Sequence, residues 1–311
     1  MAHMRLCIFT EPQHGASYAD QVKAARTTEE AGFEGYFRSD HYLTMGGFDG
    51  LPGPTDSWVT LAGLALETSR VRLGTLVTSA TFRHPGPLAI SVAQVDEMSG
   101  GRIELGFGAG WYEEEHQAYA IPFPSVRERF DRLTEQLEII TGLWGVPAGS
   151  RFNYSGTHYS VVDSPGLPKP AQSPRPPIIM GGAGPKRTPA LAARFADEFN
   201  VPFRSAAEAA RIYRVVDDAC VLAGRNDLPV KSAAVTVVSG RTDAEVRSRW
   251  GGEVLDTDSG EGAVIGTPDK IVNDLGAYVE AGATRLFLQL RDLRDTDLIE
   301  LIAAEIAPQL G

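Results

Sequence analysis

One junction recurs along this chain and constrains its fold more than any other feature. A helical segment ends at a glycine or a short turn, and an apolar run of strand length follows at once. The junction stands at Gly32 before residues 35–37, at Gly100-Gly101 before 103–106 and at Gly282 before 286–290. Glycine often ends a helix. Because polar residues such as Ser39-Asp40-His41 follow the apolar runs, we predict a βα barrel with its functional groups at the C-terminal ends of the strands.

Eight strands can be counted, and an expected helix directly follows seven of them. Strands are expected at residues 5–10, 35–37, 71–77, 103–106, 178–180, 198–201, 235–238 and 286–290, and helices at 17–31, 56–67, 87–98, 186–195, 206–223, 268–281 and 297–306. Ser17 and Thr267 are the expected N-caps of two of these helices.

The alternation breaks once. Residues 126–144 have the apolar stripe of an amphipathic helix, residues 152–159 have the pattern of a hairpin, and a proline-rich stretch follows. We therefore expect an α/β protein, a (β/α)8 TIM barrel forming one domain over residues 4–311, with an insertion between strands 4 and 5 at approximately 111–176.

Composition argues against several classes of function. A net charge of −11 disfavours nucleic-acid and anionic-membrane partners, since both need clustered Lys and Arg. No run is long enough to span a bilayer and no signal pattern opens the chain, so we expect a cytoplasmic protein. Cys7 and Cys220 have no motif spacing, and Cys7 is expected to be a buried core residue. Residues 1–3 have the pattern of a cloning remnant before a native start at Met4.

Two glycine-rich loops follow strands. Gly106-Phe107-Gly108-Ala109-Gly110 lacks the spacing of a dinucleotide fingerprint, so it is either a turn that needs glycine or backbone that a flat ring can approach closely. Gly181-Gly182-Ala183-Gly184 opens onto a helix with Lys186 and Arg187 in its first turn. Free amides beside basic residues predict a phosphate site. The alternative is a loop with ordinary surface charges.

The remaining titratable residues give weaker signals. Glu113-Glu114-Glu115-His116 could be a metal or acid–base group, but a run of charges is more often a solvated helix face, and we expect that here. The histidines lack metal-ligand spacing, so no metal site is expected. Ser39-Asp40-His41 is not a hydrolytic triad, because neighbouring side chains diverge. His84, in Arg83-His84-Pro85, is expected to be a packed or surface histidine.

Five segments together resemble the luciferase-like monooxygenase superfamily and, within it, the oxidoreductases that use the deazaflavin coenzyme F420. The segments are residues 39–41, residues 73–77 with 81–85, residues 99–102, residues 105–111 and residues 179–184. The resemblance runs nearly the whole length from Met4. It implies a βα barrel, a cofactor at the C-terminal strand ends, a small-molecule substrate and a homodimer.

The resemblance also implies roles for single residues. Asp40 would bond the ring system, His41 would face the substrate, and the bond between Leu76 and Val77 would be a cis peptide behind the ring. The cofactor-binding set it implies is Asp40, Leu76, Val77, Ser79, Gly108, Ala109, Gly110, Gly181, Gly182, Ala183, Gly184 and Lys186.

One position departs from the family pattern. Relatives that oxidise a sugar phosphate carry a glutamate where this chain has Trp111. We therefore expect a reductase of an aromatic or unsaturated compound rather than a sugar-phosphate dehydrogenase, with His41 and Trp111 as the catalytic pair. His41 would donate a proton as the hydride arrives, or would only pack against the ring.

Two other functions stay open, because this fold carries many chemistries. One is a monooxygenase of the same superfamily that uses FMN. The other is a cofactor-binding protein without catalysis.

Overall fold

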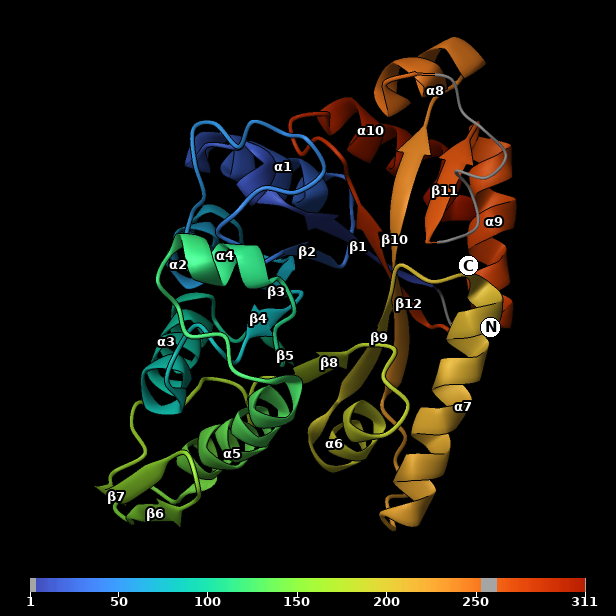
Figure 1. Cartoon of the computed structure of the whole chain (residues 1–311). Coiled ribbons are helices and arrows are strands. Elements are labelled where there is room, and N and C mark those ends of the chain that lie inside the picture. Colours follow the sequence, from blue (N-terminus) through green and yellow to red (C-terminus); the bar gives the residue numbers. More distant parts are fainter. Residues whose placement is uncertain (1–3, 253–261, 311) are drawn as a thin grey trace.

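Eight parallel strands close into a barrel in the computed structural model, which describes residues 4–252 and 262–310 (Figure 1). In order around the ring they are β1 (Arg5–Thr10), β2 (Gly35–Arg38), β3 (Arg72–Thr75), β5 (Ile103–Gly108), β8 (Ile178–Gly181), β9 (Glu198–Pro202), β10 (Val230–Ser239) and β12 (Arg285–Gln289). The ring is closed because β12 pairs with both β10 and β1. The predicted TIM barrel is confirmed. The expected remnant at residues 1–3 lies outside the described residues.

Helices surround the strands. They are α1 (Tyr18–Glu30), α2 (Ser57–Glu67), α3 (Pro85–Met98), α6 (Arg187–Phe195), α7 (Ala206–Leu222), α9 (Pro268–Glu280) and α10 (Thr296–Leu301), and α10 continues through a π-helical turn at Ile302–Ile306 and a 3-10 turn at Ala307–Gln309. Ser17 caps α1 as predicted, in a reciprocal capping box with Asp20. Thr267 occupies the N-cap of α9 but makes no side-chain capping bond. No helix of the described residues is both long and apolar enough to cross a membrane.

The predicted interruption lies between β5 and β8. It contains α4 (Glu113–Ala118), α5 (Val126–Gly145) and an antiparallel hairpin of β6 (Phe152–Ser155) and β7 (Ser160–Ser164). Leu133, Leu137 and Ile140 form the buried stripe of α5. Figure 1 shows the hairpin at the outer end of α5, away from the barrel.

The elements that were not predicted from the sequence include the 3-10 turns at Pro12–His14 and Ala307–Gln309, β4 (Thr78–Ser79), α8 (Asp243–Trp250) and β11 (Ala263–Gly266). The hairpin also extends beyond the predicted residues 152–159, because its second strand is Ser160–Ser164. β4 pairs with β5, and β11 pairs with the far part of β10. β10 is accordingly longer than the expected strand at 235–238, because its first half closes the barrel and its second half carries β11.

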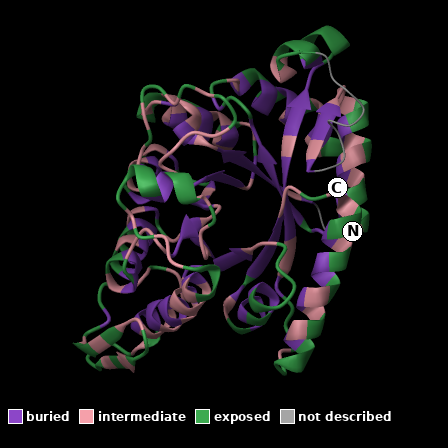
Figure 2. Cartoon of the chain, in the orientation of Figure 1, coloured by how far each residue is buried: buried purple, intermediate pink, exposed green. Residues whose placement is uncertain are grey.

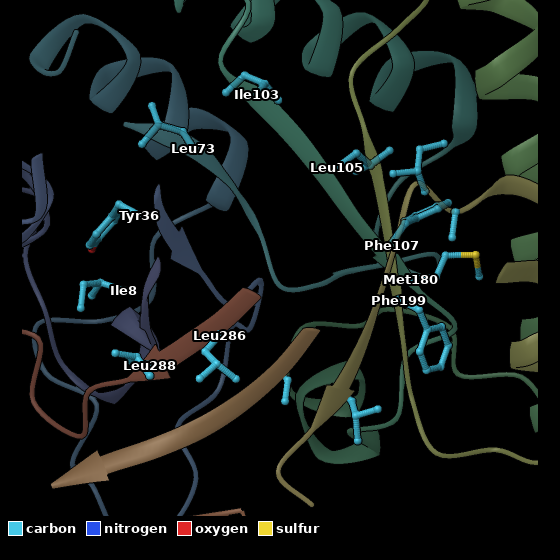
Figure 3. Packing of buried hydrophobic residues seen from close by; sticks show 14 of the residues in the cluster. Ile8, Tyr36, Leu73, Ile103, Leu105, Phe107, Met180, Phe199, Leu286 and Leu288 are labelled. Atoms are coloured by element: carbon cyan, nitrogen blue, oxygen red, sulfur yellow. The ribbon is translucent and has the colours of Figure 1, made fainter. Parts of the chain in front are cut away.

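Alternation along the strands builds two apolar cores. Residues such as Leu6 and Ile8 face the helices and join the larger core cluster, part of which Figure 3 shows. Their neighbours point into the barrel, where the second cluster consists of Cys7, Phe9, Phe37, Ile179, Ala234 and Phe287. Figure 2 shows the result, barrel strands that are mostly buried and helices exposed on their outer sides.

The N-terminal end of the barrel is filled by charge. Arg285 Nη1, at the start of β12, lies 2.7 Å from both Glu104 Oε2 and Glu198 Oε2, and Arg72 also pairs with Glu104. Arg285 Nε donates to the Cys7 sulfur at 3.3 Å. Burial raises the pKa of Cys7 to about 12, so this thiol is the inert core residue expected from the sequence. These ion pairs occupy the N-terminal end of the barrel. The candidate site lies at the opposite, C-terminal end.

Candidate active site at the C-terminal end of the barrel

The three residues after β2 point in three directions. Ser39 Oγ donates to Gln13 Oε1 at 2.6 Å, Asp40 forms an ion pair with Arg83, and His41 Nδ1 lies 3.0 Å from Glu115 Oε1. A hydrolytic triad needs its members to converge, so the predicted divergence of these side chains is confirmed.

Glu115 of α4 fixes the ring of His41. Its carboxylate is buried, and its second oxygen lies 3.1 Å from the same His41 nitrogen and accepts the Tyr42 amide at 3.0 Å. Because a carboxylate only accepts hydrogen bonds, Nδ1 carries a proton. No described residue bonds Nε2, which is therefore the nitrogen left for a substrate.

This pairing sets the charge of the imidazole. Burial alone lowers the pKa of His41, but the hydrogen bond and charge of Glu115, together with the charges of Glu11 and Asp40, outweigh burial and raise it above the ordinary value. The raised pKa extends the imidazolium form of His41 to higher pH than in a free histidine.

Asp40 is held by a chain of polar groups. Its buried carboxylate accepts from Arg83, whose guanidinium also pairs with Asp56 and donates to Tyr42 Oη at 3.0 Å. Asp56 is also the N-cap of α2. Burial opposes ionisation of Asp56, but the charge of Arg83 and the hydrogen bonds from Val59, Arg83 and Tyr42 together outweigh burial and lower the pKa of Asp56. Arg83 thus fixes the position of the Asp40 carboxylate at the strand end. Sequence reasoning did not predict the role of Arg83. His84, the residue that follows it, is exposed at the start of α3.

Glycines at the end of β5 let the chain pack closely against Val77 and Ser79. A Cβ on Gly110, where φ is +81°, would lie 2.4 Å from Ser79 Oγ, and one on Gly108 would lie 3.0 Å from Val77. These two positions therefore need glycine for local packing and backbone conformation. The peptide between Leu76 and Val77 is cis, as the resemblance predicted.

The second glycine loop leads into α6. Lys186 is the exposed N-cap of α6, with no side-chain capping bond and no acidic residue in the first turn. A helix that begins without a side-chain cap leaves its first backbone amides without a partner, as expected at a phosphate site. Arg187 turns away to α5, where Nη2 lies 2.5 Å from Asp131 Oδ1 and Nη1 donates to the Arg127 carbonyl at 2.9 Å. Lys186 is therefore better placed than Arg187 to meet an anion.

Trp111 and Tyr112 stand beside His41. The Trp111 ring is 65% exposed, lies edge-on to His41 with centroids 5.7 Å apart, and stacks on Tyr112 at 5.3 Å. Tyr112 Oη donates to the Thr44 carbonyl at 3.1 Å. The indole wall expected next to His41 therefore has a second aromatic layer behind it.

The expectation of a solvated face at residues 113–116 is wrong for half of the run. Glu113 and Glu114 are exposed, whereas Glu115 and His116 are buried. α4 has only six residues, fewer than two helical turns. The run of charged residues therefore does not show which of its side chains face the interior. In the described part of the chain, no three His, Cys, Asp or Glu side chains are grouped to hold a metal ion.

Sequence reasoning also missed Glu11. It directly follows β1, as Ser39 directly follows β2, and it accepts from Gln13 Nε2 at 3.3 Å and from Gln289 Nε2. Burial raises the pKa of Glu11 against the lowering effects of His41 and the two amides, and burial together with His41 lowers the pKa of His14 to about 4. Glu11 could have been found from its position directly after a strand, the criterion already applied to Asp40.

Two curated relatives share about half of their length with this chain. An F420-dependent glucose-6-phosphate dehydrogenase of Microbacterium testaceum is 40% identical over 172 residues, 55% of this chain and 48% of the relative. An F420-dependent hydroxymycolic acid dehydrogenase of Mycobacterium tuberculosis is 33% identical over 182 residues, 57% of this chain and 47% of the relative.

A solved structure matches over its full length. The coenzyme F420-dependent tetrahydromethanopterin reductase of Methanopyrus kandleri superposes with a TM-score of 0.80 at 20% identity, covering 100% of both chains. At that identity the match shows the fold alone. The family model for luciferase-like monooxygenases matches residues 4–250, and the chain belongs to this family.

Proposed function

We propose that this protein is an F420-dependent oxidoreductase that transfers a hydride between the deazaflavin and a small organic substrate. The observation that carries the proposal is the His41–Glu115 pair, which directs an imidazole with a free Nε2 toward the end of the barrel. The reductive direction is favoured, because the contact with Glu115 raises the pKa of His41 and so stabilises the imidazolium, the form that can give a proton to a substrate that receives a hydride.

The residues present suit such a cofactor. Asp40 is a buried acceptor fixed by Arg83, residues 108–110 follow the same end of the barrel, and the start of α6 offers free amides to a phosphate. Bound there, the deazaflavin supplies or accepts the hydride. The names of the two relatives support the choice of F420, since both contain it.

The chain's own groups perform the proton chemistry. His41 donates from Nε2 while Glu115 holds Nδ1 and balances the imidazolium charge. Trp111 forms an apolar wall next to the imidazole ring. Glu115 is committed to His41 and Tyr42, so it does not replace the exposed acid that Trp111 displaces. This arrangement favours an unsaturated substrate over a sugar phosphate.

The test is a parallel titration of the purified protein with F420 and with FMN, followed by ring fluorescence. We expect saturable binding of F420 at micromolar concentration and binding of FMN at least tenfold weaker. Reduced F420 should then be consumed with an enone or aromatic substrate, and oxidised F420 should not be reduced by glucose 6-phosphate. Tighter binding of FMN with oxygen consumption would establish the monooxygenase instead, and binding of F420 without turnover of any acceptor would establish a carrier.

A further inference from the structure

His116 is a buried histidine that the proposed chemistry does not use. It follows Glu115 on α4 and has no exposed surface. Its ring lies between Phe82 and Phe123, with centroids 5.1 and 4.5 Å away. Both ring nitrogens are nevertheless bonded. Nδ1 lies 2.6 Å from the Tyr112 carbonyl oxygen, and Nε2 lies 2.6 Å from Thr81 Oγ1.

The second contact extends into a line of hydroxyl groups. Thr81 Oγ1 lies 2.6 Å from Ser79 Oγ, at the end of β4. Ser79 also accepts the Thr81 amide at 3.4 Å and stands under the backbone of Gly110. The line therefore runs from the loop that begins α4 to the strand end where we place the cofactor.

Chemistry gives this line a direction. A carbonyl oxygen only accepts, so Nδ1 of His116 carries a proton, and in the neutral ring Nε2 has a lone pair. Thr81 must then donate to Nε2, and Ser79 must donate to Thr81. With its one proton used, the Ser79 hydroxyl offers only lone pairs to a ligand. It is a hydrogen-bond acceptor.

The hydrogen bond from His116 Nδ1 to the Tyr112 carbonyl stabilises α4. This helix has six residues, its N-cap Tyr112 makes no side-chain capping bond, and a helix this short has little stability of its own. The bond from His116 to the Tyr112 carbonyl ties its middle to its start. Glu115, the adjacent residue, is thereby kept against His41.

We propose that His116 is a positioning residue with two outputs: it fixes Glu115 against His41, and it orients the Thr81 and Ser79 hydroxyls so that Ser79 accepts a hydrogen bond from an N–H group of the bound cofactor. The second output rests on the proposed function. The first concerns this chain alone and is tested without any cofactor.

The direction of the hydroxyl line is read in the wild-type protein. In ¹⁵N-labelled protein free of cofactor, we expect the Nδ1 resonance of His116 to be that of a protonated nitrogen and the Nε2 resonance that of an unprotonated one. A protonated Nε2 would reverse the line and overturn the assignment of Ser79 as an acceptor. This measurement needs no variant and does not depend on the folding of one.

Variants separate the two outputs. His116→Asn keeps a donor near the Nδ1 position, whereas His116→Gln keeps a polar group near the Nε2 position. In imidazole NMR titrations of the cofactor-free protein, we expect His116→Gln to bring the pKa of His41 down to or below its ordinary value. His116→Asn and the control His158→Asn, on the distant hairpin, should leave it raised. An unchanged His41 in His116→Gln contradicts the first output.

Thr81→Val removes the hydroxyl from the line at nearly constant shape. We expect it to leave the titration of His41 unchanged and to weaken F420 binding about tenfold, the effect of one hydrogen bond. Unchanged F420 affinity in Thr81→Val contradicts the second output. If wild-type protein does not bind F420, the proposed function fails, while the ¹⁵N assignment and the His41 titration still decide the first output.

Discussion

His41 and Asp40 are neighbours in the chain, yet the structure gives them separate partners and therefore separate predicted roles. We expect His41→Ala to reduce turnover about a hundredfold with little change in the Kd for F420, because it removes the proton donor and no proposed cofactor contact. Asp40→Asn should weaken F420 first, because it removes a charged acceptor that Arg83 holds in place. Steady-state kinetics and fluorescence titration distinguish the two effects. Normal turnover by His41→Ala would assign the proton to water.

The charge on His41 also makes stability depend on pH. Its pKa is raised in the folded protein, so its contribution is fully present below the unfolded value near 6.5 and is lost as pH rises through the folded value. We expect Glu115→Gln to lower the free energy of unfolding more at pH 6 than at pH 9, measured by urea denaturation. The outwardly placed Glu114→Gln is the matched control and should show no such difference. An equal loss at both pH values would mean that the pair carries no net charge–charge attraction.

Sequence reasoning could identify only those site residues that directly follow a strand. Asp40 and His41 were found because they directly follow a strand, and the same criterion fits Glu11. Glu115 and His116 could not be found, because the direction of each side chain depends on how the loop after β5 folds back over β2. Their charged neighbours Glu113 and Glu114 made the whole run look solvated.

At the scale of elements, strands were predictable wherever burial on both faces left a continuous apolar run. α8 was missed because only Val246 on it is buried, so it has no apolar stripe to detect. The expected strand at 71–77 runs past the end of β3 at Thr75 and stops before β4 at Thr78–Ser79, so β4 was missed. The charged N-terminal end of the barrel was also invisible, since Glu104, Glu198 and Arg285 come from three distant strands and meet only when the barrel closes.

This cluster links β5, β9 and β12, so its removal tests the barrel directly. We expect Arg285→Met to destabilise the protein by about 3–5 kcal/mol, because Glu104 and Glu198 stay buried and lose a shared cation. Burial and the charge of Glu104 already outweigh the attraction of Arg285 and raise the pKa of Glu198. Adding Glu198→Gln to Arg285→Met should therefore recover part of the loss, in a double-mutant cycle measured by chemical denaturation. A loss below about 1 kcal/mol for Arg285→Met would show that water enters and solvates the two acids.

For the whole molecule, the expected homodimer has a suitable surface on α2 and α3. Val59 and Leu66 are 74% and 71% exposed and lie two turns apart on one face of α2, and Ile90 on the adjacent α3 is 47% exposed. A two-fold axis would place the same patch of two copies together and cover these side chains. Figure 1 shows α2 and α3 on the side of the barrel opposite α7 and α9, well apart from β10 and β12.

A charge in this patch should break the dimer without touching the site. We expect wild-type protein to elute as a dimer in size-exclusion chromatography with light scattering, and Leu66→Glu to elute as a monomer, because a buried unpaired carboxylate opposes association strongly. Leu222→Glu is the matched control, since Leu222 is 88% exposed at the end of α7 and lies outside the patch. It should remain a dimer. A dimer that survives Leu66→Glu but dissociates with Leu222→Glu would move the interface to α7, and a monomeric wild-type protein would remove the expectation altogether.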